Sequence, residues 1–242
     1  MGVNGVHSTE YIYVMQHTII KFMNIVFFTG AGISEESGIP TFRTGEDSIW
    51  NRYNPDIVCN IRAWPFHKDK ILSFFNEVRS WVEKCSPNQA HLDIASLENK
   101  HTVNVITTNI DELHEMAGST NVLHIHGNIF ESCDVNHHHI GKCDFDINIG
   151  DTHPKSKIQL RHNVVMFGEM PYYLNEANRL ISKADILVVI GTALSVYPAA
   201  GLVHNAKCKT YYIDPESTLE GDSTININKK AIDGMQELLF II

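Results

Sequence analysis

A glycine-rich stretch near the start of the chain reads GAGISEESGIPTFR over residues 30–43 and directly follows the apolar run NIVFFT at residues 24–29. A short apolar run of this kind is typical of a strand buried in a parallel sheet. A glycine-rich turn after such a strand lets backbone N–H groups come close to a diphosphate. The ordinary dinucleotide fingerprint would need a third glycine at position 35, where Glu35 stands. Gly30 and Gly32 alone would fit a plain turn equally well, so only the whole block predicts a nucleotide-binding loop.

The rest of the chain alternates between strand-like and helix-like runs. Apolar residues recur at helical spacing between Ile71 and Val82, which predicts an amphipathic helix. We expect Pro87 to open the following helix at its first position, and Pro198 to open another that runs to Ala206. Such alternation indicates an α/β fold with a doubly wound, Rossmann-like parallel sheet. The predicted strands cover residues 24–29, 103–108, 122–125, 186–190 and 210–213.

Residues 128–163 interrupt this alternation. They are rich in Asp, Asn, His and Lys and have little apolar periodicity, so we expect a small inserted module at about this position. A chain of 242 residues can hold one large domain with such an insertion. We therefore expect one domain over residues 23–242, preceded by an N-terminal extension over residues 1–22 that carries no readable function.

Composition and charge exclude several classes of protein. The net charge of −9 leaves no basic surplus to neutralise phosphates, which argues against a general nucleic-acid binder and favours basic partners such as lysine-rich protein segments. The patchily apolar residues 11–28 are too polar to span a bilayer. Five scattered cysteines, an odd number, suit reduced thiols in a cytosol. We expect a cytoplasmic protein that binds neither nucleic acid nor membranes.

Five segments in order resemble the sirtuins, the NAD-dependent protein-lysine deacylases, in their bacterial type. The resemblance covers residues 24 to about 240 and implies an enzyme that removes acyl groups from lysine, giving nicotinamide and O-acyl-ADP-ribose. The segments are the glycine-rich block 30–43, TTNID at 107–111, HIHG at 124–127, VVMFGE at 164–169 and GTALSVYPAA at 191–200.

The resemblance makes His126 the general base, with Asn109 and Asp111 as the other catalytic residues. An imidazole can accept a proton near neutral pH without being permanently charged. Asn109 and Asp111 would recognise the nicotinamide carboxamide, although Asp111 can also cap a short helix that ends at Gly118. A structural role is the alternative for each of these residues. We interpret His124 as a packing neighbour of His126.

The same resemblance implies contacts to NAD from both glycine-rich loops. Thr108 stands where the family has glutamine, Thr41 where many members have aspartate, and Asp214 where the family usually has asparagine. Phe42 could shield the reactive carbon and Arg43 could hold a ribose or phosphate, unless they are a core aromatic and a surface arginine. The full predicted set is Gly30, Ala31, Gly32, Ser34, Thr41, Phe42, Arg43, Thr108, Asn109, Ile110, Asp111, Gly191, Thr192, Ala193, Ser195, Asp214 and Ala231.

Substrate contacts are expected from Val164, Val165, Met166, Phe167 and Gly168, the segment that pairs with the substrate in the family. Acyl preference depends on two further positions. Sirtuins that remove succinyl or malonyl groups carry Tyr-x-x-Arg where this chain has Phe75 and Val78. Neither residue can pair with a carboxylate, so we expect neutral acyl groups. If the helix were shifted by one residue, Arg79 would face the pocket and this conclusion would weaken. If Phe75 and Val78 are simply core residues, the pocket still has no partner for an acidic acyl group.

The expected metal site is weak. The family's zinc module uses two Cys-x-x-Cys pairs, which is a strong tetrahedral signature. This chain has only Cys133 and Cys143 in the insertion, and their spacing is irregular. Completion by His137, His138, His139 or His153 is possible, but a histidine run in a polar loop is usually solvated, so we expect no zinc.

Two other functions remain open at this point. The same nucleotide site would suit an ADP-ribosyltransferase or an NAD hydrolase, because each breaks the same bond. A module that binds NAD or ADP-ribose without turnover is a third alternative, although a pure binder needs no base such as His126.

Overall fold

Six parallel strands form the larger of two sheets in the computed structural model, which describes residues 22–40, 49–216 and 218–242. The strand order is β3-β2-β1-β7-β8-β9, and every neighbouring pair is parallel. The predicted doubly wound sheet is therefore confirmed. Its strands are β1 (Asn24–Thr29), β2 (Thr102–Thr107), β3 (Val122–His124), β7 (Ile186–Ile190), β8 (Lys209–Ile213) and β9 (Thr224–Ile227).

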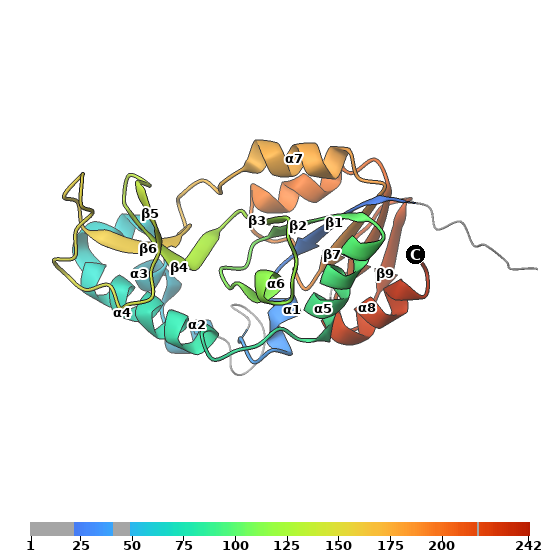
Figure 1. Cartoon of the computed structure of the whole chain (residues 1–242). Helices are drawn as coiled ribbons and strands as arrows, with labels where there is room; N and C mark the ends of the chain where they lie inside the picture. Colours follow the sequence, from blue (N-terminus) through green and yellow to red (C-terminus); the bar gives the residue numbers. More distant parts are fainter. Residues whose placement is uncertain (1–21, 41–48, 217) are drawn as a thin grey trace, which may run out of the picture.

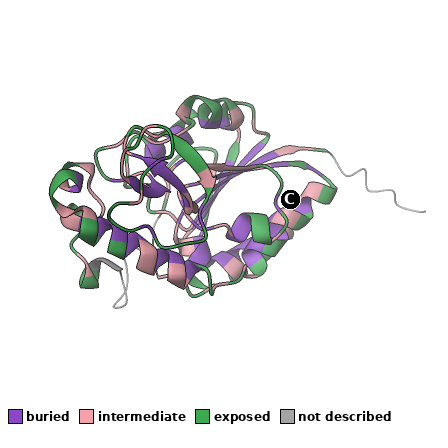
Figure 2. Cartoon of the chain, turned by 60° about the vertical axis from the view of Figure 1, so that its left-hand side comes forward, coloured by how far each residue is buried: buried purple, intermediate pink, exposed green. Residues whose placement is uncertain are grey.

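Helices cover both faces of this sheet (Figure 1). Successive strand residues point to opposite faces, so Ile25 and Phe27 pack in one core while Val26 and Phe28 pack in the other. Burial of each such side chain contributes about 1.5–3 kcal/mol. The purple interior of Figure 2 follows the strands. The first core is closed by α1 (Gly32–Glu35), α5 (Gln89–Ser96) and α8 (Ala231–Leu239), the second by α7 (Leu174–Ser182) and the 3-10 helix η3 (Ala199–Asn205).

The chain changes direction across the sheet between β1 and β7. From β1 the next strands, β2 and β3, lie on one side, and after the return to β7 the strands β8 and β9 lie on the other. In open α/β sheets, ligands bind beyond the carboxyl ends of the strands at such a switch point. The two glycine-rich loops, after Thr29 and after Ile190, meet here.

The insertion forms a second, antiparallel sheet with the order β5-β4-β6. Its core is shared with the long helix before it, because Phe74, Phe75 and Val78 pack with Ile129 and Leu160. Figure 1 shows this part as a separate lobe beside the larger sheet. Its elements are β4 (Gly127–Asp134), β5 (His139–Lys142), β6 (Leu160–Val164), α3 (Pro55–Val58), the 3-10 helix η1 (Ile61–Ala63) and α4 (Trp64–Val82); the short α2 (Ile49–Arg52) precedes them.

Three local predictions need correction. Pro198 does not open its helix at the first position but lies just before the 3-10 helix η3, which ends at Asn205. Pro87 does not open α5, because the Asn88 side chain caps that helix by accepting a hydrogen bond from the N–H of Ala90, so Pro87 lies one residue outside it. The strand β9 was missed because it is only four residues long, TINI, and lies at the sheet edge with its two central residues exposed. The remaining helices are the 3-10 helix η2 (Leu97–Asn99) and α6 (Leu113–Met116), and no helix of the described residues is long and apolar enough to cross a membrane.

Candidate active site

The two glycine-rich loops touch each other directly. The N–H of Gly32 donates to the carbonyl of Gly191 at 2.8 Å, and the N–H of Gly30 donates to the carbonyl of Ile190 at 3.0 Å. A Cβ on Gly32 would lie 2.6 Å from the Cα of Gly191, and Gly191 has a φ of +61°. Glycine is therefore required at these positions so that the two loops can approach each other, in addition to any approach of a ligand.

His126 lies in a turn just beyond the end of β3. The strand ends at His124, one residue earlier than expected, and Gly127 at φ +81° turns the chain into β4. Burial lowers the pKa of the His126 imidazole, against a smaller opposing effect from the backbone of Thr108. The ring is therefore neutral at pH 7 and has a lone pair available to accept a proton.

His124 is held differently from His126. Its Nδ1 lies 3.1 Å from the carbonyl oxygen of Asn109, and its Nε2 lies 2.7 Å from Oε1 of Glu115. Burial lowers the pKa of His124, but the Glu115 carboxylate outweighs it and the net shift is upward. Both ring nitrogens are occupied by protein partners, so this side chain ties β3 to α6.

Asn109 and Asp111 meet Ser34 of the first loop beyond the end of β2. The Asn109 amide donates to the Ser34 hydroxyl at 3.1 Å, and that hydroxyl donates to Oδ2 of Asp111 at 3.1 Å. Oδ1 of Asp111 accepts from the N–H of Leu113, so the carboxylate also caps α6 as expected. Burial raises the pKa of Asp111 more than these hydrogen bonds lower it. Three predicted residues from two distant segments are thus brought together.

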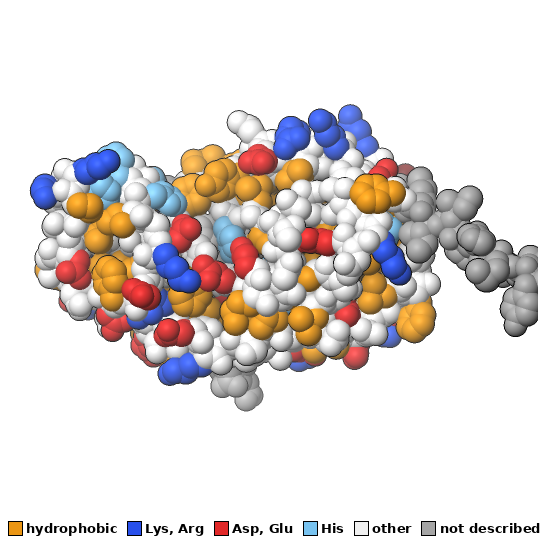
Figure 3. Space-filling model, viewed as in Figure 1, with side chains coloured by type: hydrophobic (Ala, Val, Ile, Leu, Met, Phe, Trp, Pro, Cys, Tyr) orange, Lys and Arg blue, Asp and Glu red, His pale blue; other side chains and the backbone are white. Residues whose placement is uncertain are grey.

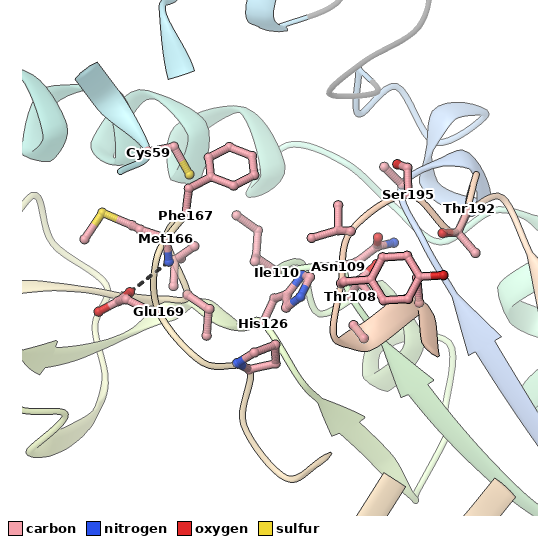
Figure 4. Close-up of a pocket in the computed structure, with 18 of the residues that line it drawn as sticks. Cys59, Thr108, Asn109, Ile110, His126, Met166, Phe167, Glu169, Thr192 and Ser195 are labelled. Atoms are coloured by element: carbon pink, nitrogen blue, oxygen red, sulfur yellow. Dashed lines mark hydrogen bonds between the residues drawn. The ribbon is translucent and has the colours of Figure 1, made fainter. Parts of the chain in front are cut away.

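A cavity of about 220 Å³ opens between the two lobes and exposes His126 (Figure 4). The predicted residues Asn109, Thr108 and Ile110 line it from the end of β2. Thr108 has lost part of its capacity to bind a ligand, because its hydroxyl donates to the carbonyl of Thr29 at 3.2 Å. The other predicted residues that line the cavity are Ala31, Phe75, Val164, Val165, Met166, Phe167, Gly168, Thr192 and Ser195.

The segment 164–168 is fixed to both lobes by its backbone. The N–H of Val165 donates to the carbonyl of His126 at 2.9 Å. Phe167 donates to the carbonyl of Cys59 and accepts from the N–H of Ile61, at 2.8 and 3.1 Å. The predicted substrate segment is therefore held in register with the predicted base on one side and with η1 on the other.

Phe75 and Val78 lie on the same face of α4 but line different cavities. Phe75 faces the main cavity, while Val78 lines a neighbouring space of about 20 Å³ together with Ala31 and Asp111. Arg79 points elsewhere: its Nη2 is 2.7 Å from Oδ1 of Asp146 and its Nη1 is 3.8 Å from Glu83. Of these three side chains, the main cavity therefore receives the aromatic ring and no cation.

The remaining predicted cofactor residues either do not line the main cavity or lie outside the described residues. Asp214 follows β8, where its carboxylate accepts from the N–H of Glu216, and it does not line the cavity. Ala231 is buried at the start of α8, and Ala193 belongs to the second loop without lining the cavity. Thr41, Phe42 and Arg43 lie outside the described residues.

Several cavity residues were not singled out from the sequence. Leu194, Val196, Tyr197, Ala199 and Ala200 complete the wall formed by the second loop. They belong to the GTALSVYPAA segment, so extending the prediction over the whole motif would have found them. Glu169 ends the VVMFGE segment and would have been found in the same way, whereas no comparable signal marked Phe28, Cys59 and Pro171.

The residues of the module do not fit a tetrahedral zinc site. The Cys133 and Cys143 thiols donate to carbonyl groups, those of His162 and Phe145. Burial raises the pKa of Cys133 to about 11, which adds to the cost of forming the thiolate that zinc binds. Across residues 22–40, 49–216 and 218–242, no three His, Cys, Asp or Glu side chains are placed to share a metal ion.

The chain is similar to known proteins over most of its length. The Sir2 family description matches residues 30–198. This chain is 39% identical over 221 residues to an NAD-dependent protein deacylase of Helicobacter pylori, and the match covers 89% of this chain and 96% of the relative. It is 35% identical over 234 residues to the NAD-dependent protein deacylase Sir2 of Mycolicibacterium smegmatis, covering 90% and 95%.

Solved structures agree with this similarity. A Sir2 homologue in complex with NAD is 35% identical, with a TM-score of 0.80 and coverage of 90% of this chain and 88% of that one. A Sir2 homologue mutant in complex with ADP-ribose is 34% identical, with a TM-score of 0.81 and coverage of 89% and 90%. Sequence, fold and the placement of His126 beside both loops lead to one conclusion: the chain belongs to the Sir2 family.

Proposed function

We propose that this Sir2 protein removes acyl groups from lysine side chains of proteins with NAD as co-substrate. One observation carries the proposal: a single cavity joins the neutral imidazole of His126, the amide of Asn109 and the substrate segment 164–168. A site that only bound a nucleotide would not need a buried base beside a backbone segment prepared for a peptide. The Helicobacter relative's name and a Sir2 structure bound to an acetylated peptide support the same activity.

The residues around the cavity suit NAD. Thr192 and Ser195 bring hydroxyl groups, Asn109 brings an amide, and the two glycine loops bring backbone at the switch point of the sheet. NAD supplies a glycosidic bond with nicotinamide as leaving group, to which an acyl oxygen can add. The residues of this chain would orient that bond and exclude water from it.

His126 would act as the general base toward a ribose hydroxyl. Its lowered pKa keeps the imidazole unprotonated at neutral pH, so the base is ready before substrate binds. Because the base must be unprotonated, activity should fall as pH drops through the lowered pKa of His126 and should reach a plateau above it. Asn109 and Asp111 would hold the nicotinamide end, with Ser34 fixing their mutual position.

The substrate would be a neutral acyl-lysine. Phe75, Val164 and Ile110 line the cavity with apolar side chains. A carboxylate placed there would be desolvated without a cation, because Arg79 is already paired with Asp146. We place this activity in the cytoplasm, acting on protein partners and not on nucleic acid or membranes, in keeping with the free cysteines and the acidic charge.

We further propose that the module works without zinc. Asp134 supports this, since its buried carboxylate accepts from Ser156 Oγ at 2.6 Å, from His138 Nδ1 at 2.9 Å and from two backbone N–H groups. These bonds hold β4, the following turn and the 153–157 segment together, a task that a metal would otherwise perform. Metal analysis of untagged protein should give well under one zinc per chain; stoichiometric zinc lost in Cys133→Ala would contradict this.

Incubation with NAD and an acetyl-lysine peptide, followed by mass spectrometry, tests the function. Deacetylated peptide with O-acetyl-ADP-ribose is the expected result. Free ADP-ribose, or protein that gains ADP-ribose, without peptide turnover would indicate an NAD hydrolase or an ADP-ribosyltransferase. Binding of NAD without formation of any product would indicate a nucleotide-binding module without catalytic activity.

A further inference from the structure

The histidine run of the module does not form a merely solvated patch. His137 lies in the turn between β4 and β5, and its ring faces the substrate segment. Its Nδ1 is 2.7 Å from the hydroxyl oxygen of Tyr172, and its Nε2 is 3.5 Å from Oε1 of Glu169. The His137 and Tyr172 rings meet edge to face, with centroids 5.5 Å apart. Figure 3 shows histidine side chains gathered on the surface of this lobe.

The hydrogen-bond network fixes which ring nitrogen carries the proton. The Asn163 amide nitrogen donates to Glu131 at 2.8 Å, so its oxygen is the acceptor that faces Tyr172. The Tyr172 hydroxyl gives its one hydrogen to that oxygen at 2.9 Å. Its own oxygen must then accept from Nδ1–H of His137. The contact is a directed hydrogen bond from His137 and not a chance encounter of polar groups.

His137 lies beside two residues that hold the two ends of the substrate loop: it donates to Tyr172, and its unprotonated Nε2 only lies near the Glu169 carboxylate. Oε2 of Glu169 accepts from the N–H of Met166 at 2.8 Å, and Oε1 accepts from buried Arg161 at 2.6 Å. Arg161 also donates to the carbonyl of Val164 at 2.8 Å. At the far end, the N–H of Tyr172 donates to the carbonyl of Ile125, beside the catalytic turn.

We propose that His137 is a positioning residue for the acyl-lysine substrate. Through its hydrogen bond to Tyr172 it braces the module against residues 164–172, the loop that carries the peptide-pairing backbone. It touches neither the base His126 nor the loops that bind NAD, so it acts on the peptide and not on the nucleotide. The proposal rests on the proposed deacylase function and adds a residue that sets the affinity for the peptide.

Glycine and asparagine are the informative replacements, because His137 has a φ of +59°. Both tolerate this backbone conformation, so neither adds strain. His137→Gly removes the brace. His137→Asn places an amide N–H near the position of Nδ1 and should restore the bond to Tyr172, whereas His137→Gln places its N–H nearer to Nε2 and should not. Lys157→Gly is the matched control, since Lys157 is exposed in the same module at a φ of +60°.

The measurements are KM for an acetyl-lysine peptide, kcat, KM for NAD, and the Kd of the same peptide by fluorescence anisotropy. For His137→Gly we expect peptide KM and Kd to rise about three- to ten-fold, the range for one directed hydrogen bond. We expect kcat and KM for NAD to stay within about two-fold, Asn to restore the wild-type values, and Lys157→Gly to change nothing. In a Tyr172→Phe background, His137→Gly should add little.

An unchanged peptide KM and Kd in His137→Gly would overturn the proposal. So would a loss that Asn fails to restore, or one that lowers kcat and thermal stability together, which would make His137 merely structural. Absence of turnover in the wild type would count against the deacylase function alone, because the peptide Kd still reads the effect of His137. A wild type that binds no peptide would overturn both.

Discussion

The parallel sheet and the inserted module are built on opposite principles. In the sheet, β1 and β7 are apolar on both faces, and the helices on each side bury Ile, Val and Phe. In the module, the strands β4 and β6 bury Asp134, Arg161 and Asn163 instead, each of them tied by side-chain hydrogen bonds.

The difference teaches where single changes should matter. Burial of many apolar side chains spreads the stability of the sheet over many contacts, each of modest size. Buried charged and polar groups make the stability of the module depend on a few contacts, since losing one partner leaves another polar group desolvated. Substitutions of site residues at the carboxyl end of the sheet should therefore have little effect on folding, while the stability of the module should be sensitive to single polar substitutions.

The largest effect should come from His126→Ala at the sheet end. Loss of a positioned base typically costs about 10²–10⁴-fold in rate, while NAD affinity and thermal stability should hold. Steady-state kinetics and calorimetry are the measurements, with exposed His204→Ala as the matched control. If the alanine variant kept most of its activity, or unfolded far more readily, the division between the two regions would not hold.

Asp134→Ala should produce the largest effect on the module side, in stability and not in NAD binding. Its carboxylate has no exposed surface. Losing hydrogen bonds to a charged group costs roughly 2–3 kcal/mol in the free energy of unfolding, measurable by urea titration. The control is Asp144→Ala, an exposed carboxylate of the same lobe. A cost below about 0.5 kcal/mol, normal for surface changes, would contradict the account.

The cost of Asp134→Ala should also depend on pH. Burial acts to raise the pKa of Asp134, but hydrogen bonds from Ser156 and His138 and from the N–H groups of His138 and Asn136 outweigh it. The pKa is therefore held well below the ordinary value of about 3.9. The stabilisation is complete above that value and is lost as pH falls below it toward the folded pKa, so wild type and variant should converge in acid.

Acyl selectivity tests the cavity that lies between the two lobes. Acetyl-lysine should be preferred over succinyl-lysine by about ten- to a hundred-fold in kcat/KM, since Phe75 offers no partner for a carboxylate. Phe75→Tyr alone places a hydroxyl in the main cavity and should narrow the ratio slightly. The double change with Val78→Arg should narrow it further only if the arginine can reach from the neighbouring space where Val78 lies. A wild-type preference for succinyl would mean that a cation outside this set faces the pocket.

Asp214→Asn should have the smallest effect. The residue ends β8 away from the cavity, and the amide oxygen can still accept from the N–H of Glu216. NAD affinity measured by calorimetry should change by much less than ten-fold, which is about 1.4 kcal/mol. A larger loss would show that this carboxylate belongs to the nucleotide site, and Asp185→Asn at the other end of the sheet would serve as the control.

The same contrast explains what the sequence could predict. The strands β1 and β7 were located to the residue, because a fully buried parallel strand is an unbroken apolar run. The module could be recognised only as an interruption, because its order comes from contacts between residues far apart, such as Asp134 with Ser156. His137 was interpreted as solvated for the same reason: its neighbours Glu169 and Tyr172 lie more than thirty positions away.

Arg79 and Val78 show a second limit of sequence reasoning. Helical spacing correctly placed Phe75 and Val78 on one buried face. It could not show that a neighbouring cavity begins between them, nor that Asp146 would engage Arg79, because both depend on how α4 meets the module.

The mutual contact of Gly30, Gly32 and Gly191 has a consequence for the evolution of this protein. A side chain on Gly32 or Gly191 would meet glycine backbone of the other loop, so a substitution at one cannot be compensated by a smaller residue at the other, because none exists. A side chain on Gly30 would meet Thr192 and the carbonyl of Gly191. The two glycine-rich loops, which are far apart in the sequence, must therefore keep their glycines together during evolution. Laboratory libraries aimed at new nucleotide specificity should leave all three glycines fixed and vary Thr192, Leu194 and Ser195, whose side chains face the cavity.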